Sequence, residues 1–218
     1  MAADLELLDE VAAGREPILR LYRWSPPALS LGRFQPDDDV DRETCARLGV
    51  EVVRRPTGGR ALLHGGDLTY AIAFTRPPGR AGTVGALYDR VAGALIAGLA
   101  RLGVTAAVAR NEGPGGAVCF ATQQGADLRV GDRKLCGSAQ VQREDSVLQH
   151  GSVLLRRLPF DETDLLRGND ETSRRQLRGA TVTLEELGAP TGARAVADAL
   201  LDGFRLRFDA VGARVEVS

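Results

Sequence analysis

Residues 115–140 contain a cysteine and a lysine that could together support acyl transfer. Cys119 follows a glycine-rich stretch, and Lys134 stands fifteen positions later (134 − 119), behind a Gly-Asp turn. A thiolate can attack a carbonyl carbon, and a nearby ammonium can lower the pKa of the thiol and stabilise the oxyanion that forms. The same residues also fit a buried thiol and a charged lysine at a hairpin end, so both interpretations stay open.

The other two cysteines have different surroundings. Cys136 is two positions from Lys134, and residues two apart on a strand share a face, so Cys136 competes for the role of nucleophile. Cys45 lies within an amphipathic helical pattern far from the other motifs, which favours a structural role. An odd number of cysteines argues against a disulfide framework and favours a reducing cytoplasm.

A glycine-rich segment, "RRPTGGRALLHGGDLTY" at residues 54–70, is the second candidate for chemistry. Gly58 and Gly59 permit positive φ angles and let backbone N–H groups approach an anionic or carbonyl ligand closely. The segment has neither the Gly-Lys-Ser/Thr of a Walker loop nor the Gly-x-Gly-x-x-Gly of dinucleotide-binding proteins. A hairpin with solvated arginines is the plain alternative, but the polar side chains around the glycine pair favour a site. These side chains are Arg54, Arg55, Thr57, Arg60 and His64.

The composition of the 218 residues excludes several classes of function. A formal net charge of −1 gives no basic field for nucleic acid, and no apolar run is long enough to cross a bilayer. The opening "MAADLELLDE" is acidic and amphipathic, unlike a signal peptide. Two histidines and the lack of a Cys-x-x-Cys pair predict no metal site.

Hydrophobic periodicity predicts an α+β fold with a mixed, largely antiparallel sheet and flanking helices. Helical patterns cover residues 5–14, 37–49, 84–99 and 193–204. Strand patterns cover residues 17–24, 28–32, 50–55, 67–74, 104–110, 126–130 and 146–155, and a terminal strand follows the last helix. Residues 67–74 alternate well enough for a strand, and Gly131-Asp132 predicts a hairpin turn. The polar stretch at residues 169–179 is predicted to be an exposed connection.

Three segments, in matching order and spacing, resemble the biotin/lipoate protein ligase superfamily, which includes lipoate–protein ligases and octanoyltransferases. "RRPTGGRALLHGGDLTY" resembles its Arg-Arg-x-Ser/Thr-Gly-Gly-x-x-x-x-His loop. "RKLCGSAQ" resembles its Lys-x-x-Gly-Ser-Ala-Gln segment, and "LQHGSVLL" resembles its His-Gly-Ser/Thr strand. The resemblance is clear over about residues 1–155 and looser beyond.

The resemblance implies a fold as well as a site. The fold would be one catalytic domain over residues 1–218, with its core at about 1–155, a C-terminal helix and strand at about 176–218, and no separate C-terminal accessory domain. Its helices would lie on one side of a mixed sheet. The chain starts inside the helix that carries the family's Asn-x-Ala-x-Asp pattern, so we expect a preceding edge strand to be missing.

An acyl pocket would lie beneath the glycine pair, with Cys119 and Lys134 as the catalytic residues. We expect His150 to be a supporting side chain and not a base, because it stands in an apolar strand. The residues implied to bind the acyl group or the substrate are Arg55, Thr57, Gly58, Gly59, His64, Gly137, Ser138, Ala139, His150 and Gly151, with Gln149 on the same strand as the last two.

Within the superfamily, Cys119 indicates the cysteine-dependent octanoyl-[acyl-carrier-protein]:protein N-octanoyltransferase branch. A carrier-protein thioester would acylate Cys119, and a lysine of a lipoyl domain or of the glycine cleavage H protein would accept the octanoyl or lipoyl group. The enzyme would be a monomer without a cofactor, and would bind neither nucleic acid nor membrane. The alternative is a lipoate–protein ligase that uses ATP and Mg²⁺ through lipoyl-AMP. Biotin ligation and a non-catalytic binding subunit are more distant, and the retained Lys134 argues against the latter.

Overall fold

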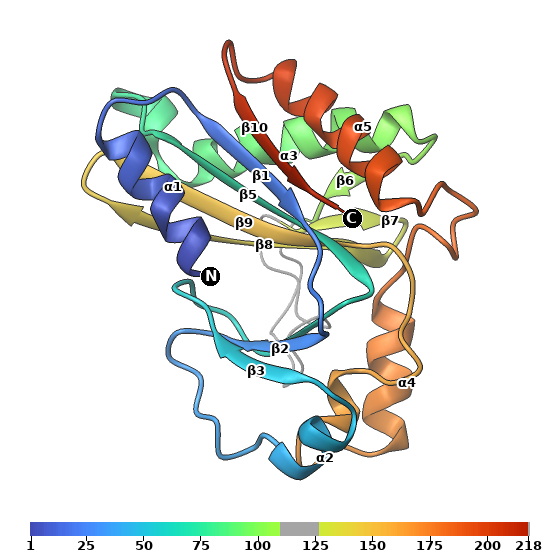
Figure 1. The fold of residues 1–218 in the computed structure, drawn as a ribbon. Helices are drawn as coiled ribbons and strands as arrows, with labels where there is room; N and C mark the ends of the chain where they lie inside the picture. The colour runs from blue at the N-terminus through green and yellow to red at the C-terminus, as the bar shows by residue number, and fades with distance from the viewer. Residues whose placement is uncertain (110–126, 218) are drawn as a thin grey trace.

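The structure is a computed structural model that describes residues 1–109 and 127–217. These residues form a seven-stranded sheet with flanking helices and a separate three-stranded sheet (Figure 1). The α-helices are α1 (Ala2–Ala12), α2 (Arg42–Arg47), α3 (Val84–Arg101), α4 (Glu171–Ala180) and α5 (Ala193–Arg205), with short 3₁₀ turns η1 (Gly79–Gly82) and η2 (Glu162–Asp164). The strands are β1 (Ile18–Tyr22), β2 (Ala28–Leu31), β3 (Glu51–Arg54), β4 (Leu62–His64), β5 (Asp67–Thr75), β6 (Ala107–Val108), β7 (Leu128–Val130), β8 (Arg133–Arg143), β9 (Ser146–Leu154) and β10 (Gly212–Glu216).

The large sheet has the order β10-β1-β5-β9-β8-β7-β6. Its neighbours pair antiparallel except for β1 and β10, which run parallel. The predicted α+β fold with a mixed, largely antiparallel sheet is therefore confirmed. The second sheet, of order β3-β2-β4, was not predicted, because β4 lies inside the segment that was interpreted as a loop.

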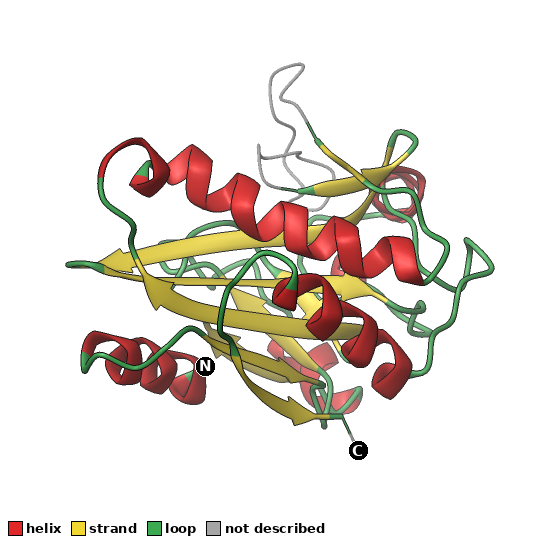
Figure 2. Ribbon diagram, turned by 90° about the horizontal axis from the view of Figure 1, so that it is seen from above, coloured by secondary structure: helices red, strands yellow, loops and turns green. Residues whose placement is uncertain are grey.

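Helices cover both faces of the large sheet, which corrects the expectation that they lie on one side. Leu68, Tyr70 and Ile72 of β5 pack in a cluster with α3 and α5. Ala71 and Ala73, which point to the opposite face of the same strand, pack instead against α1. Figure 2 shows α3 and α5 on one side of the sheet and α1 on the other. Because both faces are covered, residues 67–74 are all buried despite the alternation in their sequence.

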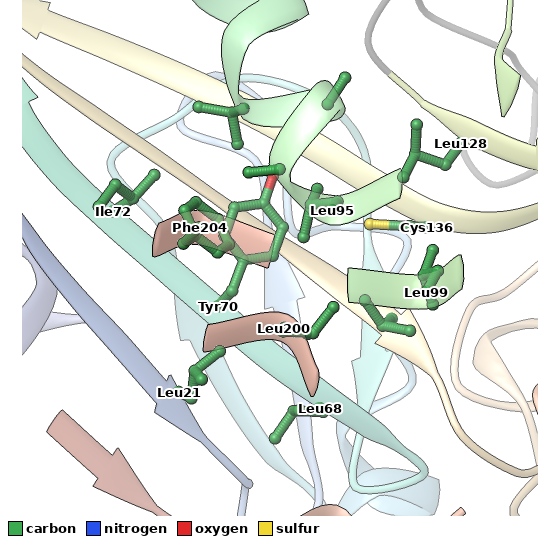
Figure 3. Packing of buried hydrophobic residues seen from close by; sticks show 14 of the residues in the cluster. Leu21, Leu68, Tyr70, Ile72, Leu95, Leu99, Leu128, Cys136, Leu200 and Phe204 are labelled. Atoms are coloured by element: carbon green, nitrogen blue, oxygen red, sulfur yellow. The ribbon is translucent and has the colours of Figure 1, made fainter. Parts of the chain in front are cut away.

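The main core lies between the large sheet and the helix pair α3 and α5. Leu95 and Leu99 of α3 and Leu200 and Phe204 of α5 pack there against Tyr70 (Figure 3). The two helices approach closely, because a Cβ atom added at Gly98 or Gly203 would overlap the backbone of the facing helix.

Three local predictions differ from the structure. The stretch at residues 169–179 forms helix α4, because Asp170 and Ser173 make a capping box and Leu177 is buried. The helix predicted at residues 37–49 shortens to α2, which begins after the N-cap Asp41. The strand predicted at 104–110 reduces to two residues in its described part, Ala107–Val108.

No helix within residues 1–109 or 127–217 is both long and apolar enough to cross a membrane.

Candidate active site

A cavity is lined by residues of β5, β8 and β9 of the large sheet, by residues of β2 and β4 of the small sheet, and by Met1, which precedes α1. Figure 1 shows the small sheet facing these strands of the large sheet. The cavity wall combines strands β8 and β9 with the segment between β3 and β4, called here the glycine loop (residues 55–61). Apolar surface predominates in this wall, as expected for a pocket that receives a hydrocarbon chain. The lining residues are Met1, Ser30, Arg55, Gly58, Gly59, Arg60, Leu62, His64, Thr69, Asp127, Lys134, Gly137, Ser138, Ala139, His150 and Gly151.

Nearly all of the predicted site residues therefore meet at one cavity. Among the predicted residues that the structure describes, Thr57 and Gln149 are not in its wall. Thr57 is buried and bonded to the lining residue His150, and Gln149 is buried and bonds to the hydroxyl of Tyr70. Cys119 lies outside the described residues.

Lys134 is a buried lysine and not a charged residue exposed at a hairpin end. Its side chain is 6% exposed, and its Nζ atom lies 2.8 Å from a carboxylate oxygen of Asp127. The other oxygen of Asp127 accepts a hydrogen bond from the backbone N–H of Ser138 at 3.3 Å. Asp127 thus ties the ammonium to the start of β7 and to the middle of β8, so that the charge has a fixed place in the cavity wall.

Cys136 belongs to the hydrophobic core and not to the cavity. It is fully buried beside Leu95 and Leu99 (Figure 3), and its burial raises the pKa of the thiol to about 12. A thiol in this state is a poor nucleophile near neutral pH. Cys45 is buried in a separate cluster with Leu29 and Leu31 of the small sheet, as its helical pattern predicted.

Arg54, the last residue of β3, and Arg55, in the glycine loop, donate to protein carbonyl groups, which changes the role expected from the sequence. Nη1 of Arg54 donates to the carbonyl groups of Gly32 and Gln35 at 2.8 and 2.7 Å. Nε and Nη2 of Arg55 donate to the carbonyl oxygen of Gly58 at 3.2 and 3.1 Å. Arg55 is buried, so the guanidinium group holds the loop from inside.

Gly59 must be glycine for two reasons. Its φ angle is +96°, a value that L side chains rarely adopt. A Cβ atom at this position would also lie 2.7 Å from Nη2 of Arg55. Of the two glycines predicted to permit positive φ angles, only Gly59 has one: Gly58 does not, and a Cβ atom at Gly58 would meet no atom within 4 Å.

His64 lies in the cavity wall with both ring nitrogens bonded to protein groups. Nδ1 lies 2.9 Å from the carboxylate of Asp67, and Nε2 lies 2.8 Å from the hydroxyl of Ser30. The ring also stacks on Trp24, with 4.6 Å between centroids. Both ring nitrogens are therefore occupied, and neither is left to hydrogen-bond the acyl group or substrate that the resemblance implied His64 to bind.

His150 supports the hydroxyl of Thr57 from beneath the loop. Its Nε2 lies 2.7 Å from Oγ1 of Thr57, whereas its Nδ1 lies 3.5 Å from the Asp4 carboxylate, too far for a well-formed hydrogen bond. Burial lowers the pKa of His150, so the ring is neutral near pH 7. Burial opposes the charge of Asp4, but the facing His150 and the bond from Arg20 lower its pKa overall, and the hydroxyl of Tyr22 also donates to it.

Three buried carboxylates, Asp4, Asp67 and Asp127, were missed in the sequence. Asp67 stands three residues after His64 in the same motif, and that spacing could have indicated it. Asp127 bonds to Ser138 across the predicted hairpin, but the register shifts between Leu128 and Arg129, and a regular hairpin would have placed Asp127 opposite Cys136 instead. Asp4 reaches His150 only through the packing of α1 on the sheet, which no local pattern contains. Within residues 1–109 and 127–217, no three metal-binding side chains cluster.

Comparison with known proteins identifies close relatives. A model of the family "lipoyl protein ligase A/B catalytic domain" matches residues 1–205. The octanoyltransferase LipM of Kyrpidia tusciae is 40% identical over 215 residues, which cover 92% of this chain and 77% of the relative. The octanoyltransferase LipM of Carboxydothermus hydrogenoformans is 44% identical over 161 residues, which cover 72% of this chain and 60% of that relative.

The fold has a counterpart among solved structures. The crystal structure of a lipoate-protein ligase A bound with ATP matches with a TM-score of 0.80 at 22% identity, covering 99% of this chain and 81% of that one. At this identity the likeness establishes the fold alone. Together with the family match and the identity to the relatives, it confirms the resemblance carried by the three sequence motifs. The chain belongs to the lipoyl protein ligase A/B catalytic-domain family.

Proposed function

We propose that the chain transfers an octanoyl group from the thioester of an acyl-carrier protein to a lysine amine of a lipoyl-domain protein or of the glycine cleavage H protein. The observation that carries the proposal is the buried ammonium of Lys134, fixed by Asp127 in the wall of a largely apolar cavity. The two relatives at 40% and 44% identity are octanoyltransferases, which favours this reaction over other activities of the family.

Cys119 is the proposed nucleophile, in a segment outside the described residues. Its thiolate attacks the thioester carbonyl carbon, and the tetrahedral intermediate collapses with loss of the carrier's thiolate, which takes up a proton. The acceptor amine, in its neutral form, then attacks the acyl-enzyme, loses a proton and expels the Cys119 thiolate. Exchange between two thioesters is nearly isoenergetic, so the first step needs neither ATP nor a metal ion.

Lys134 is the proposed electrostatic catalyst of both steps. A buried ammonium stabilises the negative charge that develops on the carbonyl oxygen more strongly than a solvated one does, because the surroundings screen it less. It also favours the thiolate over the thiol if the two groups face each other. The glycine loop bounds the same cavity, and we propose that it holds the carbonyl end of the octanoyl group.

We propose that the reaction takes place in the cytoplasm, as the cysteine content of the sequence indicated. Cys45 and Cys136 are both free thiols, which is consistent with a reducing compartment. The ATP-dependent ligase stays a weaker candidate, because its support is a likeness of fold at 22% identity.

Mass spectrometry of the intact protein tests the proposal. After mixing with octanoyl-acyl-carrier protein, the enzyme should gain one octanoyl group, and a lipoyl domain added next should remove it. Cys119→Ala should form no adduct, whereas the matched Cys136→Ala variant should react like the parent protein because its thiol is fully buried. An adduct on Cys119→Ala would exclude this nucleophile. Modification of the lipoyl domain that requires ATP and free lipoate would favour the ligase instead.

A further inference from the structure

Asp67 begins a chain of buried hydrogen bonds that leads to the glycine loop. It is 0% exposed at the start of β5. The backbone N–H of Gly65 donates to one carboxylate oxygen at 2.8 Å, and the hydroxyl groups of Thr69 and Ser152 donate to the other. Burial opposes the charge, but His64 and these donors outweigh it and lower the pKa of Asp67, so the group is ionised.

The carboxylate fixes the protons along the chain. An ionised carboxylate only accepts, so Nδ1 of His64, at 2.9 Å, carries a proton. In the neutral ring Nε2 is then an acceptor, and the hydroxyl of Ser30 donates to it at 2.8 Å. The Ser30 oxygen in turn accepts from Nη1 of Arg55 at 3.1 Å. Every donor on this path therefore points toward Asp67.

Arg55 is the end of the path that touches the loop. Its Nη1 also donates to the carbonyl oxygen of Ser30 at 2.8 Å, while Nε and Nη2 bind the carbonyl oxygen of Gly58 and Nη2 binds that of Arg60. The guanidinium is planar, so the direction of Nη1 determines where the other two nitrogens point. Stacking on Trp24 keeps the ring of His64 from rotating away.

We propose that Asp67 is a positioning residue that orients Arg55, and thereby the glycine loop, through the ring of His64. The inference rests on the proposed acyl transfer and assigns a role that neither the motifs nor the cavity wall indicates. His64 becomes a relay between two fixed charges, and its ring nitrogens do not contact the acyl group.

Asp67→Asn tests this relay with little change of shape. If its amide N–H₂ faces His64, the ring must accept at Nδ1 and carry its proton on Nε2. That proton competes with Arg55 for the Ser30 oxygen. Nitrogen-15 NMR of the ring should show the Nδ1–H form in the parent protein and the Nε2–H form in Asp67→Asn.

Loop dynamics give a second measurement that does not depend on activity. Amide order parameters of Gly58 and Gly59 should fall from about 0.85 toward 0.6 in Asp67→Asn and in Ser30→Ala. Ser152→Ala is the matched control, because Ser152 bonds to the same carboxylate oxygen but lies off the path to Arg55. It should leave the order parameters unchanged.

Octanoyl transfer gives the third measurement. Asp67→Asn and Ser30→Ala should each slow acyl-enzyme formation by about 10- to 100-fold, since a misplaced loop costs orientation. Asp67 and Ser30 are joined through His64, so the double variant should be no slower than the slower single variant. Urea denaturation establishes that each variant is folded, and Ser30→Ala carries the test if Asp67→Asn does not fold.

The measurements separate two kinds of failure. A parent protein that transfers no octanoyl group would remove the proposed function, while the NMR arms would still decide on the relay. Unchanged loop order in both Asp67→Asn and Ser30→Ala would overturn the relay. Additive losses of rate in the double variant would overturn it as well.

Discussion

At the scale of single residues, the site is a set of charges held by buried partners. Lys134 and Asp127 form one such pair, with side chains 6% and 3% exposed. A buried pair contributes little net stability, but removal of one member leaves a costly charge behind. Stability and activity should therefore respond differently to changes in this pair.

Lys134→Met should destabilise the protein by about 3–5 kcal/mol, because it removes the buried counter-charge of Asp127. The double variant Lys134→Met/Asp127→Leu should recover most of this loss without recovering acyl transfer. Urea denaturation and the octanoyl-adduct assay measure the two properties. A double variant that regains transfer would show that the ammonium has no part in the reaction.

The sequence predicted the residues with chemistry better than those that hold them. The glycine pair, Lys134 and His150 could be placed because each stands in a local motif. Among the residues that hold them, Asp4 could not be placed, since it reaches His150 on β9 through a tertiary contact that has no sequence period. His64 was assigned to a ligand because both of its actual partners, Asp67 and Ser30, were assigned no role.

At the scale of elements, a few residues determine whether helix α4 forms and how closely helices α3 and α5 pack. Helix α4 forms with one buried side chain, Leu177, and a capping box. Because the rest of the helix is polar, its composition indicated an exposed connection and not a helix. The close crossing of α3 and α5 depends on Gly98 and Gly203, which a periodicity argument treats as weak helix positions.

Gly203→Ala should destabilise the protein by about 1–3 kcal/mol, because the added methyl group would overlap the backbone of α3 at Ala94 and Gly98. The matched control is Gly85→Ala at an exposed helical position with open space around it. That control should be neutral or stabilising by up to about 1 kcal/mol. Thermal unfolding of both variants checks the difference, and equal effects would contradict the packing account.

At the scale of the whole molecule, two sheets and helices on both faces create one cavity from distant parts of the chain. The sequence predicted the large sheet because recognisable turns separate its strands, although β6 and β7 have only two and three residues. It did not predict that α1 covers the opposite face, since an amphipathic helix does not specify which surface it meets. Nor did it reveal a buried acid, Glu162, that couples stability to pH.

Burial raises the pKa of Glu162 to about 7, against an ordinary value of 4.5. Because the folded pKa is the higher one, the stability associated with protonated Glu162 is present below about pH 4.5 and is lost as the pH rises through 7. Glu162→Gln should therefore stabilise the protein at pH 8 by about 3 kcal/mol, and by little at pH 4. Urea denaturation at both pH values checks this, and a difference independent of pH would contradict it.

The place of Met1 in the cavity wall has a practical consequence for handling this protein. Any polypeptide fused directly ahead of it emerges at the cavity in which the proposed acyl transfer takes place. An affinity tag there would act as a tethered competitor at millimolar local concentration. No residue of strand β10 lines the cavity, so an affinity tag placed after the last residue should interfere less with the proposed site.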